Sequence, residues 1–377
     1  MNLHFAFAFF ALIVTINDCR ALDGESKDKE LVQAHVIFRH GERTTYQFYP
    51  NDPHINKTFH PIGLGGLTNN GKLGEYKLGK FLRKEYNSLI GELYSDQDVD
   101  VRSTNTIRTI QSAQLVLAGL YPPVSEQIWH PELRWQPIPV FSKLKPEEDL
   151  LHPELCPKKL AYYDDLPNQG SIYQTFIKPY ESLYKYVEEK SGMKIRHPHQ
   201  LLEFYFVVNT EEDLHLNLPE WVHKVYPDQI YPVASLTYSY HNMDNEIKKI
   251  NAGYLVKKIL MDAFNMTEVP KQEGVKKLYL YSGHESTLGY LLFALDVLKP
   301  HIPAYGSAIM IELYKDKQSE YFIKIKYRNS PVANAALEFI LPGCNGRTFC
   351  PLKKFFDLQN HYLPTLSIEE ACKLDSP

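Results

Sequence analysis

The amino-acid sequence predicts an α/β fold, because three apolar segments read as strands and each runs through a polar junction into a helix. The segments are 36–38, 98–101 and 277–281. Their junctions carry, in chain order, Arg39, His40 and Arg43, then Arg102, then His284 and Glu285. Strands rich in Val, Ile and Phe suit the interior of a mixed or parallel sheet. Because ligands of open α/β sheets bind beyond the carboxyl ends of the strands, the junctions predict one shared site.

The first junction has the most pronounced chemistry. It reads VIFRHGERTT over residues 36–45, a buried strand that ends in a charged loop. Gly41 lets the backbone turn tightly where a ligand approaches. Two guanidiniums and an imidazole favour an anion site with a ring nitrogen free to attack. The alternative is a solvated charged loop after an edge strand.

Helices are predicted beside these strands. Thr68 or Asn69 is a candidate N-terminal cap of a helix that continues to about residue 86. Gly71, Gly74 and Gly79 lower the intrinsic stability of this helix and indicate close packing on a sheet. Further helices are predicted over about 104–118, 244–264 and 286–297, and strands near 307–314 and 320–327.

The chain divides by pattern into a core and an insertion. Residues 159–240 are aromatic, charged and mostly helical, without strand alternation. We therefore predict a core of 22–145 and 240–377 and a mostly helical cap at 146–239. A length of 377 residues fits two domains or one domain with a large insertion. The net charge of −4 gives no basic field for nucleic acid.

The N-terminus predicts export. Residues 3–16 are almost wholly apolar and are followed by Cys19-Arg20-Ala21, which is typical of a secretory signal peptide at 1–21 with cleavage after Ala21. The alternative, a membrane anchor, needs about 20 apolar residues. The mature chain is predicted to be secreted and to have no membrane span. A lysosomal location is the alternative.

Four cysteines remain after cleavage: Cys156, Cys344, Cys350 and Cys372. They allow three pairings, of which we favour Cys344–Cys350, a small loop, and Cys156–Cys372, which ties the tail to the middle of the chain. A zinc site is the competing interpretation, but the spacings do not match one. The sequons at Asn56 and Asn265 predict glycosylation.

Together the junctions predict metal-free phosphoryl transfer. Fixed guanidinium forks suit a tetrahedral oxyanion such as a phosphate monoester. The chain has no P-loop pattern and no metal-ligand spacing, so we expect neither a metal nor a cofactor. A neutral imidazole would attack phosphorus, and Glu285 would protonate the leaving alkoxide. Each residue has a simpler interpretation: Glu285 as an exposed helix start, His284 as a core histidine, and Arg102 as a salt-bridge residue at a strand end.

These motifs make the sequence similar to the histidine acid phosphatases, the prostatic and lysosomal branch of the histidine phosphatase superfamily. The family's RHGxRxP motif resembles residues 39–45, its RST-D-x-x-RT element resembles 102–109, and its HD dipeptide falls on His284-Glu285. The LTxxG helix start, the WQPIPV stretch, the LPGC…CPL segment and the late Cys372 also match.

The resemblance implies a three-layer α/β/α sandwich with a central mixed sheet, of the phosphoglycerate mutase type, and a smaller, mostly helical cap. It implies His40 as nucleophile, the acid after His284 as proton donor, and phosphate binding by Arg39, Arg43, Arg102 and His284. It also supports the two disulfides and implies small phosphate monoesters or phosphoproteins as substrates, an acidic pH optimum and a homodimer.

Three residues depart from the family pattern. Thr45 replaces Pro, Asn105 replaces Asp, and Glu285 replaces the donor Asp. Glu285 keeps the acid but adds a methylene. The departures motivate an alternative function, a catalytically weak secreted binding protein on the same scaffold. Phosphoglycerate mutase activity is a further alternative, which export and disulfides disfavour.

Overall fold

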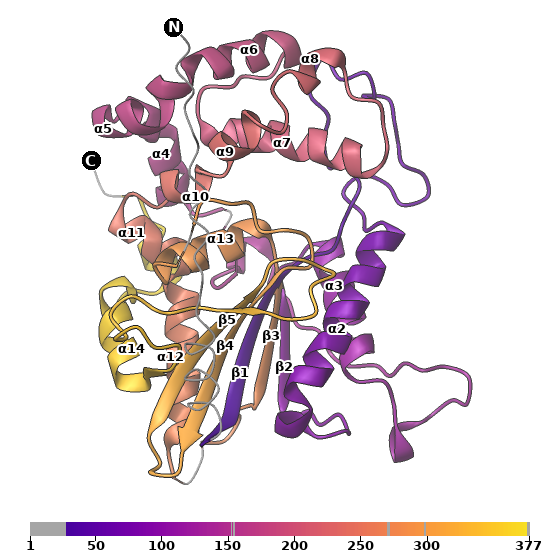
Figure 1. Cartoon of the computed structure of the whole chain (residues 1–377), viewed down its shortest axis with the longest axis vertical. Helices are drawn as coiled ribbons and strands as arrows, with labels where there is room; N and C mark the ends of the chain where they lie inside the picture. The colour runs from indigo at the N-terminus through magenta and orange to yellow at the C-terminus, as the bar shows by residue number, and fades with distance from the viewer. Residues whose placement is uncertain (1–27, 152, 154, 270–271, 298, 375–377) are drawn as a thin grey trace, which may run out of the picture.

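The computed structural model describes residues 28–377 except 152, 154, 270–271, 298 and 375–377 (Figure 1). The predicted signal peptide, including Cys19 and Ala21, lies outside the described residues. The division into core and cap at 146 and 239 stays a prediction.

In the described part of the chain, seven strands form one mixed sheet with the order β2-β3-β1-β4-β5-β6, and β7 pairs with β5. The strands are β1 (Lys29–Arg39), β2 (Val99–Ser103), β3 (Leu278–Gly283), β4 (Ala308–Asp316), β5 (Tyr321–Arg328), β6 (Leu337–Glu338) and β7 (Cys350–Pro351). β3 is parallel to both β1 and β2, whereas β4 is antiparallel to β1. The sheet is therefore mixed, as expected.

The register of the parallel strands brings the three predicted junctions to one edge. Ser282 of β3 lies opposite Phe38 of β1 and Ser103 of β2. All three strands run in the same direction, so the residues that follow them leave the sheet side by side. This parallel trio positions the candidate site.

Helices cover both faces of the sheet, which gives the expected three layers (Figure 1). Ala34, Val36 and Phe38 pack in one cluster with residues of α2 and α3. Ile37, on the opposite face of β1, packs with residues of α12, α13 and α14. This alternation is the two-residue period of a strand buried on both sides. The covering helices are α2 (Asn69–Ile90), α3 (Ile107–Leu120), α12 (Tyr254–Thr267), α13 (Glu285–Ala294) and α14 (Leu352–Gln359).

A third hydrophobic cluster lies among helices above the carboxyl edge of the sheet (Figure 1). We call helices α4 to α10 the helical cap. They are α4 (Pro157–Asp165), α5 (Gly170–Ile172), α6 (Glu181–Ser191), α7 (Pro198–Asp213), α8 (Glu220–His223), α9 (Ile230–Ala234) and α10 (Thr237–Tyr240). The remaining helices, α11 (Asn245–Lys248) and α15 (Ile368–Ala371), lie before α12 and near the C-terminus.

The start of α2 follows the sequence expectation, but the packing of its glycines does not. The Thr68 side chain accepts a hydrogen bond from the Gly71 amide and so caps the helix. A Cβ on Gly79 would lie 2.0 Å from the Val116 carbonyl oxygen of α3, and one on Gly71 equally close to the Glu42 carbonyl oxygen. The prediction that these glycines pack on the sheet was therefore wrong: they let α2 approach α3 and the loop after β1.

Both expected disulfides are present. Cys156 pairs with Cys372 across a sequence separation of 216 residues, and Cys344 pairs with Cys350. The first connects the start of α4 to the residue that follows α15. The pairings are confirmed, and the zinc interpretation of these cysteines is excluded.

Candidate active site

His40 follows the last residue of β1, and its side chain is 1% exposed. Its Nδ1 lies 2.9 Å from the Gly41 carbonyl oxygen. A carbonyl only accepts, so Nδ1 carries the proton and Nε2 is left with its lone pair. Burial, followed by the charges of Arg108, Arg39, His284 and Arg43, holds the pKa of His40 well below its ordinary value. Burial and these charges therefore disfavour the protonated imidazole.

The loop after His40 is fixed by close backbone contacts. A Cβ on Gly41 would lie 2.6 Å from the Gly71 carbonyl oxygen, so only glycine fits there. The Gly41 amide donates to Ser112 Oγ of α3 at 3.1 Å, and the Thr68 amide donates to the Glu42 carbonyl oxygen. These contacts tie the loop to α2 and α3 and hold His40 at the sheet edge.

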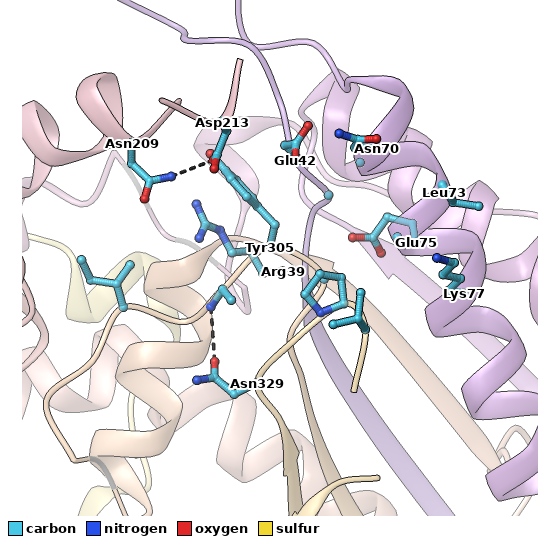
Figure 2. Close-up of a pocket in the computed structure, with 18 of the residues that line it drawn as sticks. Arg39, Glu42, Asn70, Leu73, Glu75, Lys77, Asn209, Asp213, Tyr305 and Asn329 are labelled. Atoms are coloured by element: carbon cyan, nitrogen blue, oxygen red, sulfur yellow. Dashed lines mark hydrogen bonds between the residues drawn. The ribbon is translucent and has the colours of Figure 1, made fainter. Parts of the chain in front are cut away.

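Arg39 and Arg43 flank His40, and each is 3% exposed. Arg39 Nη1 donates to the Pro303 carbonyl oxygen at 2.6 Å, and its guanidinium lies over the Tyr305 ring at 4.0 Å; Figure 2 shows the two side chains together. Arg43 lies over the Tyr46 ring and donates to the Thr44 carbonyl oxygen. Arg39 Nε and Nη2 and Arg43 Nε have no hydrogen-bond partner in the described structure, which leaves donors for an anion.

Arg108 supplies the third guanidinium of the site. It lies in the first turn of α3, and its Nη2 is 3.4 Å from His284 Nδ1. Burial, followed by the charges of Arg43 and Arg39, lowers the pKa of Arg108 to about 10, and Glu285 opposes this shift. Arg108 remains a cation at acidic and neutral pH, and its proximity to two other arginines indicates a site built for an anion.

His284 lies opposite His40, with the two ring centroids 5.6 Å apart. It precedes α13 as its N-terminal cap, and its Nε2 is 3.0 Å from Thr104 Oγ1. Contacts from Arg108 and Thr104 to its two ring nitrogens fix its orientation. The structure thus brings His284 to the site, as the sequence predicted, and not into the core.

Arg102 is not brought to this cluster. Its Nη2 lies 2.8 Å from Glu148 Oε1 and 2.6 Å from Asp149 Oδ1. It is still inside β2, where side chains project from the face of the sheet and not beyond its edge. Arg108, in the first turn of a helix, points back toward the N-terminus and hence toward the edge. The salt-bridge interpretation therefore describes Arg102, and Arg108 occupies the place expected for it.

Glu285 is the first residue of α13. Its Oε2 lies 3.8 Å from Arg39 Nε, and its side chain is 19% exposed. Glu285 is thus a carboxyl group beside the arginines, close enough to serve an oxygen bound there. The other two departures from the family pattern lie elsewhere: Asn105 is exposed, and Thr45 is buried and donates to the Gln47 carbonyl oxygen at 2.5 Å.

The sequence reasoning missed several residues that complete the site. Tyr305, whose ring centroid is 5.8 Å from that of His40, comes from a loop with no periodic signal. Ser112 and Thr104 act through hydrogen bonds that only the tertiary fold creates. The sequence pattern could have identified Arg108, because it is a basic residue in the first turn of a helix that directly follows a parallel strand.

Two features are absent from the part of the chain that the structure describes. No group of three or more His, Cys, Asp or Glu side chains is placed to hold a metal ion. No helix of the described chain is long and apolar enough to cross a membrane.

The sequence of this chain is similar to those of known phosphatases. Residues 30–328 match the model of the histidine phosphatase superfamily (branch 2). A venom acid phosphatase of Apis mellifera is 35% identical over 343 residues, which cover 89% of this chain and 86% of the relative. Human prostatic acid phosphatase is 32% identical, covering 91% and 88%, and human lysosomal acid phosphatase is 30% identical, covering 90% and 80%.

Solved structures agree with the fold. A Hafnia alvei phytase in complex with tartrate superposes with a TM-score of 0.65 at 15% identity, covering 93% of this chain and all of the phytase. A Citrobacter braakii phytase gives a TM-score of 0.60 at 18% identity, covering 92% and 100%. The named acid phosphatases support a phosphatase, and hence hydrolase, activity. The chain belongs to branch 2 of the histidine phosphatase superfamily.

Proposed function

We propose that this phosphatase hydrolyses phosphate monoesters in acid, with His40 as nucleophile and Glu285 as proton donor. One observation carries the proposal: a buried His40, whose Nδ1 faces the Gly41 carbonyl oxygen and leaves Nε2 free to attack, lies among three arginines with unused donors. An imidazole in solution would be protonated at the same acidic pH and could not attack.

The reaction takes two steps. In the first, His40 Nε2 attacks phosphorus, the P–O bond to the alcohol breaks, and Glu285 gives its proton to the leaving oxygen. In the second, the Glu285 carboxylate takes a proton from water, the water oxygen attacks phosphorus, and the P–N bond breaks to release phosphate and neutral His40. The second step restores the Glu285 proton and the free His40 imidazole that the first step used, so the cycle closes without a cofactor.

The arginines act on the phosphate. We assign Arg39, Arg43 and Arg108 to its non-bridging oxygens, with His284 as a fourth contact. Their charges are already in place before the substrate arrives, so they stabilise the transition state without reorganisation. Burial strengthens this effect because water does not screen it.

The first experiment measures hydrolysis of p-nitrophenyl phosphate between about pH 4 and 7. We expect turnover that survives a chelator, and an acid-labile phosphoprotein after a rapid quench. His40→Ala should abolish both, whereas His223→Ala, at an exposed histidine of the helical cap, should retain both. Absence of turnover in the wild type would contradict the proposal.

We further propose export, with removal of residues 1–21 after Ala21, glycosylation at Asn56 and Asn265, and a homodimer. The relatives named for venom and lysosomes support an exported chain. N-terminal sequencing of protein secreted from eukaryotic cells tests the cleavage, and a mobility shift after glycosidase treatment tests the sequons. Light scattering coupled to gel filtration tests the dimer.

A further inference from the structure

A cavity of about 570 Å³ opens beside the phosphate site. It lies between the first half of α2, the end of α7 and the loops at 302–306 and 329–332 (Figure 2). Arg39 and Gly41 belong to its wall, so it adjoins the position that we assign to the phosphate. A group attached to a bound phosphate has this cavity as neighbouring space.

Carboxyl groups from three separate elements line the cavity: Glu42 in the loop after β1, Glu75 in α2 and Asp213 at the end of α7. Glu75 is fully buried, and neither of its carboxyl oxygens has a hydrogen-bond partner in the described structure. Figure 2 shows Glu42 and Asp213 near each other on one side of the cavity and Glu75 below them. The charges of Arg328 and Arg39 offset part of the burial of Glu75 but supply no hydrogen bond. A buried carboxyl group without a hydrogen-bond partner is costly to keep, so Glu75 indicates a ligand.

The carboxyl groups also oppose one another. Burial, followed by the charge of Glu42, raises the pKa of Asp213 to about 6, and Glu212 adds to this while Arg39 and His215 oppose it. Burial raises the pKa of Glu75 well above its ordinary value. A positive group bound between Glu42 and Asp213 would relieve the repulsion, whereas a second anion would increase it.

The cations that line the cavity do not cancel its preference for a positively charged group. The Arg39 guanidinium donates to Pro303, lies 3.8 Å from Glu285, and faces the phosphate that we place there. Lys77 also lines the cavity, but its side chain is exposed to solvent, which screens its charge. Arg328, next to Glu75, is not part of the lining and donates to the carbonyl oxygens of Gly306 and Pro331. Once Arg39 is neutralised by phosphate, the part of the wall formed by Glu42 and Asp213 is acidic.

The rest of the wall suits an organic cation. The side chains of Asn70, Asn209, Asn329, Tyr205 and Tyr231 also line the cavity. Tyrosine rings attract ammonium groups through their faces. Carboxyl groups and aromatic faces together suit an alkyl-bearing ammonium group, which a cavity of this volume can hold.

We propose that this cavity receives the alcohol portion of the substrate and selects alcohols that carry an ammonium group over those that carry a second anion. Glu42 and Asp213 are the specificity-determining residues, and Glu75 adds a hydrogen-bonding carboxyl group at the buried wall. The inference rests on the proposed function and narrows its substrate class.

The test compares three esters of equal length: 4-aminobutyl, 4-hydroxybutyl and 3-carboxypropyl phosphate. Their leaving alcohols differ only at the far end of the chain, so the chemical step is matched. At about pH 6.5 the amine and the carboxylate are both charged. We expect kcat/KM to fall in the order amine, alcohol, carboxylate, with about tenfold between the extremes, because solvent partly screens the charge interactions.

Three variants locate the effect. Asp213→Asn should reduce the amine-to-carboxylate ratio about threefold, because half of the opposing pair is lost. Asn70→Asp, at an exposed position in the first turn of α2, should increase the ratio, and an acid is favourable at a helix N-terminus. Glu212→Gln is the matched control: it removes a neighbouring charge of α7, but Glu212 is exposed and accepts from Tyr226 outside the cavity wall.

Equal kcat/KM for the three esters in the wild type would overturn the proposal, as would a ratio that Glu212→Gln changes as much as Asp213→Asn. Hydrolysis of p-nitrophenyl phosphate, measured in parallel, separates failure of the selectivity proposal from failure of the proposed function. Absence of this hydrolysis in the wild type contradicts the proposed function itself. If Asp213→Asn proves unstable by its melting temperature, Asn70→Asp decides alone, since an unchanged ratio in that variant contradicts a role for charge in the cavity.

Discussion

His40 at the sheet edge and His241 after α10 are both buried, with exposures of 1% and 2%, and burial lowers the pKa of both. Their surroundings differ. His40 lies among arginines whose guanidiniums keep free donors. His241 stacks on Tyr163, with centroids 3.8 Å apart, lies 4.7 Å from His199, and has its Nδ1 2.9 Å from the Tyr290 hydroxyl.

The difference teaches that a lowered histidine pKa does not identify a catalytic residue. At the sheet edge a bound anion can neutralise the arginines. The repulsion between their charges is therefore relieved when substrate binds. Beside the helical cap, His241 is packed against Tyr163, and burial lowers its pKa without placing it next to an anion site. Four predictions that can break this comparison follow from the site and the cap, and His40→Ala is the most severe of them.

Glu285→Gln should have the next largest effect. Loss of the donated proton should lower kcat for alkyl phosphates about 10²–10⁴-fold, and for p-nitrophenyl phosphate less, because that leaving group needs a proton less. Glu285→Asp keeps the acid but shortens its reach, so its kcat should fall between wild type and the Gln variant. Steady-state kinetics with both substrates measures this, and a Gln variant as active as wild type would remove Glu285 from the mechanism.

Arg108→Ala should lower kcat/KM about 10²–10³-fold, the usual effect of deleting one transition-state donor. Arg102→Ala is the matched control, because Arg102 is tied to Glu148 and Asp149 away from the site. We expect its kcat/KM to stay within about threefold of wild type, since the loss falls on stability and not on the phosphate. The reverse order of the two variants would place Arg102 at the phosphate after all.

His241→Gln should change the pH dependence of stability and not catalysis. In the unfolded chain His241 binds a proton at an ordinary pKa of about 6.5, whereas burial, followed by the charges of His199, His197 and Lys159, lowers its pKa in the folded chain. The unfolded state therefore binds more protons in acid, and the free energy of unfolding falls below about pH 6.5 by up to about 1.4 kcal/mol per pH unit.

Melting temperatures between about pH 7 and 5 check this prediction. His241→Gln should lose less stability in acid than wild type, whereas His223→Gln, at an exposed position of the cap, should follow wild type. Equal slopes for all three proteins would show that His241 does not contribute to acid sensitivity.

The sheet edge and the helical character of the cap were predictable from the sequence, whereas the cavity beside the site was not, for a physical reason. His40, His284 and Glu285 directly follow buried strands, so local pattern and the rule that parallel strands share an edge place them. Arg102 and Arg108 lie in one short stretch, and only the alternation of a strand and the backward tilt of helical side chains decide which of them reaches the edge. Tyr305, Glu75 and Asp213 come from distant segments to line one cavity, an arrangement that periodicity does not encode.

The disulfide between Cys156 and Cys372 has a consequence for a chain exposed to proteases. It makes a covalent ring that contains the whole helical cap and strands β3 to β7 of the sheet. A single cleavage anywhere inside the ring leaves both pieces attached, so a nicked enzyme keeps His284 linked to His40. Such a protein would run as one band on a gel without reductant and as two bands with it.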